Sequence, residues 1–124
     1  MIEHYRIIEI ARKTIKLEAV SLISLEESIG KEFCKVVVSI FNAKGRVVIC
    51  GIGKSGLIGK KISATLNSTG TSAIFIHAAE ASHGDIGAVK SNDIVLAISN
   101  SGNTNEITDL IPFFKNNGNF LIGM

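Results

Sequence analysis

The arrangement of apolar and polar residues along the chain changes character near residue 45. Before that point, apolar residues recur every three or four positions among Lys, Arg and Glu, which predicts one long amphipathic helix over residues 2–25. A second helix is predicted after Ser28, which can cap it, and it ends within residues 42–45. Its apolar side consists of Phe33, Val36, Val37 and Ile40. Such a helical pair either covers a sheet or forms a subunit contact.

After residue 45 the apolar residues form short β-branched runs. Strands are predicted at residues 46–50, 73–77, 93–98 and 119–122. Their apolar character is continuous rather than alternating, which is typical of parallel strands covered on both faces. Helices are predicted between them at residues 55–68 and 104–116, with a short helical turn at 79–83. The pattern predicts an α/β fold, a three-layer doubly wound parallel sheet preceded by a two-helix N-terminal segment.

The length of 124 residues suffices for one domain with one core. Because the chain stops on the predicted fourth strand, we expect the fold to be truncated there, with one face or edge of the sheet bare. The two cysteines, Cys34 and Cys50, lack CxxC spacing, and we expect both to be buried reduced thiols. The long first helix favours a homo-oligomer, either a dimer or a tetramer.

Charge and hydropathy exclude two classes of partner. A net charge of +2 provides no electrostatic footprint for nucleic acid. No run of residues approaches the roughly 18 to 20 apolar residues that span a bilayer, and no signal peptide is visible. We therefore expect a cytoplasmic protein with no nucleic-acid partner and no membrane partner.

A glycine-rich turn, GIGKSGLIGKK at residues 51–61, joins the first predicted strand to a helix. Its residues Gly53, Lys54 and Ser55 match the end of a triphosphate-binding GxxxxGK[ST] loop, but Val48 occupies the position of the first glycine. The turn also matches the GxGxxG motif of dinucleotide sites, although the acidic residue expected about 20 positions later is absent and Glu80 comes late. Both motifs share an anion-binding helix start, and the plainer alternative is a tight turn that needs glycine.

A second polar loop, AISNSGNTNEI at residues 97–107, follows the third predicted strand. A helix needs only one capping residue, so its row of hydroxyl and amide side chains exceeds what capping requires, although an ordinary capped turn remains the alternative. Parallel strands place both loops at the same edge of the sheet, where they suit a compact sugar phosphate better than a long dinucleotide. The row consists of Ser99, Asn100, Ser101, Asn103 and Thr104, with Gly102 among them.

Three stretches together resemble the sugar isomerase (SIS) domain of the bacterial arabinose-5-phosphate isomerase family. They are GIGKSGLIGKK, STGTSAIFIHAAEASHGDIG and DIVLAISNSGNTNEITDLIPFFK. The resemblance implies interconversion of arabinose 5-phosphate and ribulose 5-phosphate, at the start of the route to 3-deoxy-manno-octulosonate in lipopolysaccharide. It also implies that residues 1–124 are a partial SIS domain, without the fifth strand, the further helices with another catalytic Glu and a His, and the regulatory domains that family members usually carry.

The resemblance assigns roles to individual residues. Lys54 and Glu106 match catalytic positions, and we expect Glu106 to act as acid and base while Lys54 stabilises the developing oxyanion. His83 is expected to assist ring opening or proton transfer. The phosphate of the sugar is expected to bind to Gly53, Ser55, Ser99, Asn100, Ser101 and Thr104. Without the resemblance, Glu106 could simply favour a helix dipole, His83 could be a hydrogen-bonded loop residue and Lys54 could be solvated.

Other functions stay open on the residues alone. His77, Glu80, His83 and Asp85 lie within nine positions, but their spacing matches no common zinc pattern. We therefore expect no cofactor and no metal, with His77 and His83 as the candidates if a metal binds. A non-catalytic phosphosugar-binding fragment is the main alternative to the isomerase, and a dinucleotide-dependent oxidoreductase ranks below both.

Overall fold

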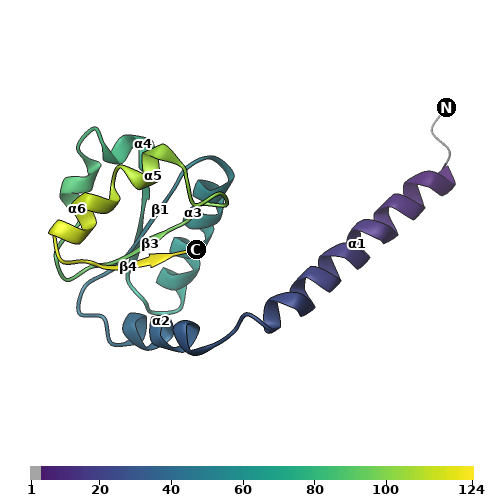
Figure 1. Ribbon diagram of the computed structural model, residues 1–124, viewed down its shortest axis with the longest axis horizontal. Helices are drawn as coiled ribbons and strands as arrows, with labels where there is room; N and C mark the ends of the chain where they lie inside the picture. The colour runs from purple at the N-terminus through teal and green to yellow at the C-terminus, as the bar shows by residue number, and fades with distance from the viewer. Residues whose placement is uncertain (1–3) are drawn as a thin grey trace. The chain divides into compact units, whose positions relative to one another are not determined.

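The computed structural model describes residues 4–124, and the chain divides into two compact units, Met1–Lys35 and Val36–Met124 (Figure 1). The first unit consists of helix α1 (His4–Glu26) and the start of α2 (Lys31–Phe41). The predicted first helix is thereby confirmed from residue 4 onward, while its predicted residues 2 and 3 lie outside the described part. No residue of α1 is buried.

Two predictions for this helical segment are wrong. Ser28 does not cap α2, because α2 begins at Lys31 and Gly30 directly precedes it. The Ser28 hydroxyl instead donates a hydrogen bond of 2.7 Å to the Leu25 carbonyl at the end of α1. Cys34 is exposed rather than buried. It lies in the first turns of α2, two positions before the half-buried Val36. Two positions correspond to about 200° around a helix, so Cys34 lies on the side of α2 away from Val36. Phe33 and Val37, predicted on the apolar side, are also exposed.

Four parallel strands form the sheet of the second unit: β1 (Val47–Gly51), β2 (Ala73–His77), β3 (Ile94–Ala97) and β4 (Phe120–Gly123). Their order is β2-β1-β3-β4. All four predicted strands are confirmed to within a residue or two. Every residue of β1 is buried, because this strand has neighbours on both sides and helices over both faces.

Alternate residues of the strands pack into two core layers, and this gives the predicted three-layer arrangement. On one face, Ile49 and Leu96 pack with residues of α2 and of α3 (Gly53–Ser68). On the other face, Val48 and Val95 pack with three short helices, α4 (Ala78–Ala81), α5 (Asn105–Thr108) and α6 (Ile111–Asn116). Figure 1 shows these helices around the sheet. A short 3₁₀ helix, Asp85–Ala88, was not predicted.

The predicted helix over residues 104–116 is wrong in one respect, since it is two helices rather than one. Pro112 lies at the start of α6 and has no backbone N–H to continue the hydrogen-bond ladder from α5. In a continuous helix its ring would also clash with the carbonyl four residues earlier, at Thr108, and α5 ends at that residue. The helix over residues 55–68 is confirmed, but it begins two residues earlier, at Gly53.

A buried polar network lies at the amino ends of the strands. Asp93, which is 2% exposed, accepts hydrogen bonds of 2.8 Å from both the backbone N–H and the guanidinium of Arg46, and one of 2.9 Å from the Lys90 N–H. The Asn119 amide donates to the carbonyls of Lys90 and Asp93 at 2.7 and 2.8 Å. Burial alone would raise the pKa of Asp93, but its hydrogen bonds with Arg46 and Lys90 outweigh it and lower that pKa.

Among residues 4–124 we find no helix that is both long enough and apolar enough to cross a membrane.

Candidate functional site

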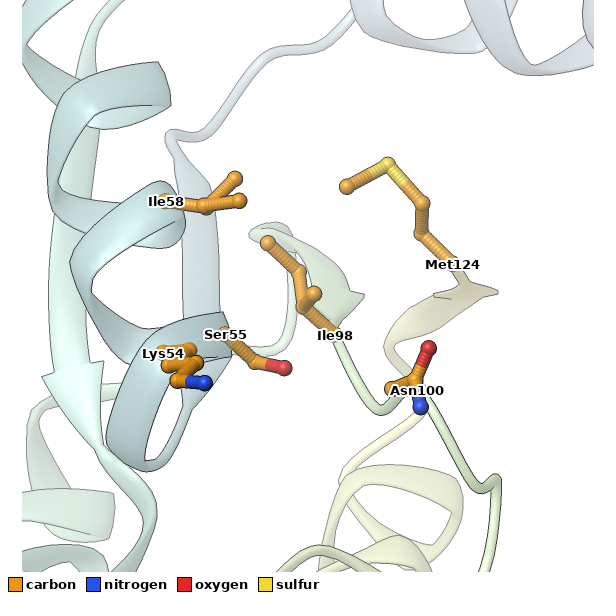
Figure 2. A pocket seen from close by; sticks show the side chains of 6 residues that line it. All are labelled: Lys54, Ser55, Ile58, Ile98, Asn100 and Met124. Carbon is orange, nitrogen blue, oxygen red and sulfur yellow. The ribbon is translucent and has the colours of Figure 1, made fainter. Parts of the chain in front are cut away.

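The strand order places a crevice at the carboxyl ends of β1 and β3. From β1 the chain crosses to β2 on one side and then returns to β3 on the other, so the loops that follow β1 and β3 diverge at this point. A cavity of about 530 Å³ lies there, between the start of α3 and the end of β3 (Figure 2). It is lined by Lys54, Ser55, Ile58, Ile98, Asn100 and Met124.

The start of α3 presents backbone donors without a side-chain cap. Ile52 occupies the N-cap position and makes no side-chain cap hydrogen bond, since its hydrocarbon side chain holds no acceptor. The first hydrogen bond of the helix runs from the Gly56 N–H to the Ile52 carbonyl at 3.1 Å. The N–H groups of residues 53–55 therefore have no acceptor inside the helix. Together with the Lys54 ammonium and the Ser55 hydroxyl, they form a site suited to an anion.

Glycine is needed in this turn for two separate reasons. Gly53 has a φ of 58°, a left-handed conformation that other residues rarely adopt. Gly51 and Gly56 bring the strand end and the helix start into backbone contact, because a Cβ added at Gly51 would lie 3.1 Å from the Gly56 nitrogen. The glycines thus meet the demand of a tight turn, as the plainer interpretation expects, and the same turn exposes the helix start to the cavity.

In the second polar loop, three hydroxyl groups hold the loop itself. The Ser99 and Thr104 hydroxyls share a hydrogen bond of 2.8 Å, and the Gly102 N–H donates to the hydroxyl oxygen of Ser99 at 3.1 Å. The Asn103 N–H donates to the Ser101 oxygen at 3.2 Å. A hydroxyl that accepts an N–H keeps its own O–H, so Ser101 retains a donor for a ligand.

The structure brings together part of the predicted phosphate site. Lys54 and Ser55 line one side of the cavity and Asn100 lines the other, with Ile98 between them (Figure 2). Gly53 belongs to the same turn. Ser99 instead lines a neighbouring cavity of about 380 Å³, whose wall also includes Gly102 and Met124. Ser101 and Thr104 belong to the same loop as Asn100.

The two predicted proton-transfer residues lie outside the lining of the cavity that contains Lys54. Glu106 is exposed in the first turn of α5. His83 is exposed in the turn after α4, where its backbone N–H donates to the Glu80 carbonyl at 2.9 Å. Both residues come after the carboxyl end of a strand, at the edge of the sheet where the cavity lies. The geometry therefore assembles the anion-binding groups more completely than the acid and base groups.

His77 lies at the same edge, at the end of β2, where it pairs in register with Gly51 of β1. Its Nδ1 atom is buried without a hydrogen-bond partner among the described residues. No group of three or more His, Cys, Asp or Glu side chains gathers as a possible metal site in residues 4–124. His77 and His83, the predicted candidates for a metal, therefore belong to no larger ligand cluster there.

The apolar wall of the cavity, formed by Ile58, Ile98 and Met124, is not among the residues predicted for the site. Ile58 lies four residues after Lys54 on α3, and residues at this spacing share one face of a helix, so its position beside Lys54 could have been predicted. Ile98 ends the apolar run of the third predicted strand, where its N–H donates to the Cys50 carbonyl at 2.8 Å. Met124 is placed by the pairing of β4 with β3, including a bond of 2.9 Å from the Ser99 N–H to the Met124 carbonyl, which no local pattern indicates.

Comparison with protein families and curated sequences gives concordant matches. The model of the SIS domain matches residues 39–124. The chain is 50% identical over 124 residues to arabinose 5-phosphate isomerase KdsD of Pseudomonas aeruginosa, which covers all of this chain and 38% of that protein. It is 46% identical over 113 residues to arabinose 5-phosphate isomerase GutQ of Escherichia coli, covering 91% of this chain and 35% of that protein. The chain thus spans little more than a third of the length of these relatives.

Solved structures share the fold. A protein of Escherichia coli CFT073, solved in complex with the sugar phosphate arabinose 5-phosphate, superposes with a TM-score of 0.93 at 38% identity, covering 98% of this chain and 65% of that one. A putative sugar-phosphate isomerase of Listeria monocytogenes superposes with a TM-score of 0.94 at 33% identity, covering 99% and 65%.

Proposed function

We propose, because this chain belongs to the SIS domain family, that it binds a sugar phosphate and takes part in aldose-ketose isomerisation. The substrate pair is arabinose 5-phosphate and ribulose 5-phosphate, and its relatives in Pseudomonas aeruginosa and Escherichia coli are named as isomerases of arabinose 5-phosphate. The observation that carries the proposal is the single cavity that joins the uncapped start of α3 to Asn100 of the loop after β3.

The phosphate binds at the start of α3. Its oxygens accept hydrogen bonds from the free N–H groups of residues 53–55, the Ser55 hydroxyl and the Asn100 amide, while the Lys54 ammonium supplies the positive charge. Ser99, Ser101 and Thr104 hold the second loop in place. The Ser101 O–H, and the one O–H of the Ser99–Thr104 pair that is not donated within the pair, add donors to the phosphate. A phosphate bound in this way places the sugar along the carboxyl edge of the sheet.

Isomerisation needs a proton to move between adjacent carbons. Glu106 removes the proton from C2 of the aldose and returns it to C1, while a proton passes from the C2 oxygen to the C1 oxygen, so the balance closes without a cofactor. Lys54 stabilises the enediolate oxygen that develops during the transfer, and His83 assists ring opening. Both Glu106 and His83 follow strands that end at the cavity's edge of the sheet.

The cellular setting follows from the same proposal. The reaction belongs to the synthesis of 3-deoxy-manno-octulosonate for lipopolysaccharide, which takes place in the cytoplasm. The protein acts as a homo-oligomer, supported by α1, a 23-residue helix none of whose residues is buried. Apolar side chains of a helix at that exposure need a partner surface.

A coupled test separates binding from turnover. Purified chain is incubated with arabinose 5-phosphate, ribulose 5-phosphate is assayed, and binding is followed by calorimetry. We expect both binding and turnover. Binding without turnover would favour the phosphosugar-binding module, whose specific support is that Glu106 and His83 lie outside the cavity lining. Absence of both would overturn the proposal.

A matched pair of variants tests the role of Glu106. Glu106→Gln keeps the size of the side chain but removes the base, and we expect turnover to fall about 10²- to 10⁴-fold with little change in binding. Asp109→Asn, at an exposed carboxylate just after α5, is the control and should retain turnover. Equal turnover in the two variants would remove Glu106 from the mechanism.

A further inference from the structure

One side of α1 carries a lengthwise row of apolar residues, which we call the α1 seam. Its members are Ile8, Ala11, Ile15, Leu22 and Leu25, at alternating steps of three and four residues, with Glu18 at the one polar position between Ile15 and Leu22. This spacing is typical of helices that pack side by side along their length. The seam is exposed, and Ile15 and Leu22 are 66% and 70% accessible.

Such a helix requires a partner. Most of the stability of protein helices comes from burying their apolar face rather than from the helix alone. Apolar residues also occur off the seam, at Ile10, Leu17, Val20 and Ile23, all more than half exposed. A helix with apolar residues on several sides is one that becomes buried in an assembly.

The charges of α1 are segregated along its length. Residues 4–16 carry four cations, at Arg6, Arg12, Lys13 and Lys16, against one anion, at Glu9. Residues 17–27 carry three anions and no Lys or Arg. A parallel pair of such helices would place cations beside cations and anions beside anions. An antiparallel pair places the basic half of each helix beside the acidic half of the other.

We propose that α1 pairs with α1 of a second copy of this chain in antiparallel orientation through the α1 seam. In the register that overlaps the two seams most fully, Ile8 of each copy faces Leu25 of the other, and Ala11 faces Leu22. Five apolar residues from each copy are then buried together, and the basic and acidic halves of the two helices lie alongside one another.

The polar position in the seam fits this register. Glu18 of each helix lies beside Ile15 of the other, within one turn of that helix's Arg12 and Lys16. A carboxylate so placed gains a cation in the antiparallel pair, whereas in a parallel pair it would face the same carboxylate of its partner. A polar residue at one seam position is a common means of fixing the orientation of paired helices. The proposal specifies the surface of the proposed homo-oligomer and rests on that part of the proposed function, but not on its catalysis.

Cysteine cross-linking in the full chain tests the orientation. Two single variants, Ile8→Cys and Leu25→Cys, are made with Cys34→Ser to remove the exposed native thiol, while Cys50 is buried and remains. In the antiparallel pair, like positions at residue 8 lie about 25 Å apart, because 17 residues separate residue 8 from residue 25 at about 1.5 Å per residue. A disulfide needs Cβ atoms within about 3.5–4.5 Å.

We expect a covalent dimer after mild oxidation of the mixture of the two variants, and none from either variant alone. Association measured by sedimentation should weaken as NaCl rises from about 0.05 M to about 0.5 M, because the attraction between the helix halves is screened. A disulfide from either single variant would show parallel helices and overturn the proposal. If the protein is an oligomer but no disulfide forms, the proposed α1 interface is wrong while the proposed homo-oligomer stands. If the protein is a monomer, both proposals are wrong. The isomerase assay reports separately on the catalytic proposal.

Discussion

The two edges of the sheet both carry polar residues, but they use them differently. At the amino edge, Asp93 is 2% exposed, and Arg46, Lys90 and Asn119 supply or accept every hydrogen bond of a closed network. At the carboxyl edge, the start of α3 has no side-chain cap and Lys54 and Ser55 face a cavity. Polar groups at the amino edge are satisfied within the protein and stabilise it, whereas the donors around the cavity at the carboxyl edge are left available to a ligand.

The amino edge should have the largest effect on stability. Asp93→Ala leaves the Arg46 guanidinium without its buried partner, and we expect the free energy of unfolding to fall by about 3–5 kcal/mol in urea titrations. If that variant does not fold, Asp93→Asn keeps part of the network and should still be clearly destabilised. Asp109→Ala, at an exposed carboxylate, should change stability by less than about 0.5 kcal/mol. Similar losses for both positions would erase the difference between the edges.

Acid should remove a smaller part of the same stabilisation. The pKa of Asp93 lies below its ordinary value of 3.8 in the folded protein, so the unfolded chain binds more protons near that pH. The contribution of Asp93 is therefore complete above its unfolded pKa and is lost as pH falls through the lower folded pKa. We expect the stability gap between the natural chain and Asp93→Asn to narrow between about pH 6 and about pH 2 in unfolding titrations. A constant gap would show that the carboxylate charge is not what stabilises this edge.

The carboxyl edge should show a moderate backbone effect at Gly53. Gly53→Ala forces a side chain into a left-handed conformation, with φ at 58°, and should cost about 1–2 kcal/mol of folding free energy. The matched control is Gly87→Ala, where no atom lies within 4 Å of an added Cβ and no left-handed φ is required. Thermal and urea unfolding of both variants measure the difference, and a loss at Gly87 as large as at Gly53 would argue against backbone strain as the cause.

The smallest effect on stability is expected at Lys54, which lines the cavity. Lys54→Met should change the free energy of unfolding by less than about 0.5 kcal/mol, because Lys54 is exposed beside the cavity. Binding of inorganic phosphate should weaken at least about tenfold, since a contact with a charged group is worth about 1.5–3 kcal/mol. Lys61→Met, at an exposed lysine farther along α3, should leave phosphate binding unchanged in calorimetry. Weakened binding in both variants would point to general charge rather than to the cavity.

Much of the second unit could be predicted because its strands are continuous apolar runs bounded by glycine and polar turns. All four strands and their parallel orientation follow from that pattern, but the strand order does not. The break between α5 and α6 was missed although Pro112 stood in the sequence, because an apolar helical spacing on both sides of it concealed the stop. The Ser28 cap was misplaced because a hydroxyl at a helix junction can serve either helix, and here it bonds to Leu25 of the earlier one.

The candidate site was predicted in part, for reasons of geometry. The glycine spacing and Lys54–Ser55 pointed to an anion-binding helix start, which depends on a short stretch of chain. In the second loop, the orientation of each side chain depends on backbone angles such as the φ of 69° at Gly102, and the residue types do not reveal them. The sequence therefore identified the row of polar residues, but not that Asn100 alone of that row would line the cavity with Lys54 and Ser55.

Close backbone packing between Gly51 and Gly56 limits how ligand selectivity can be redesigned in this protein. Any side chain at Gly51 would meet backbone atoms of residues 55 and 56 at 3.1 Å, and backbone cannot step aside as a flexible side chain can. The backbone of this turn is thus fixed, and with it the start of α3 that carries Lys54 and Ser55 into the cavity lining. Exchanging Ile58 or Met124, whose side chains line the cavity, changes its size without touching this turn, so trimming them would admit a longer ligand and enlarging them would favour a shorter one (Figure 2).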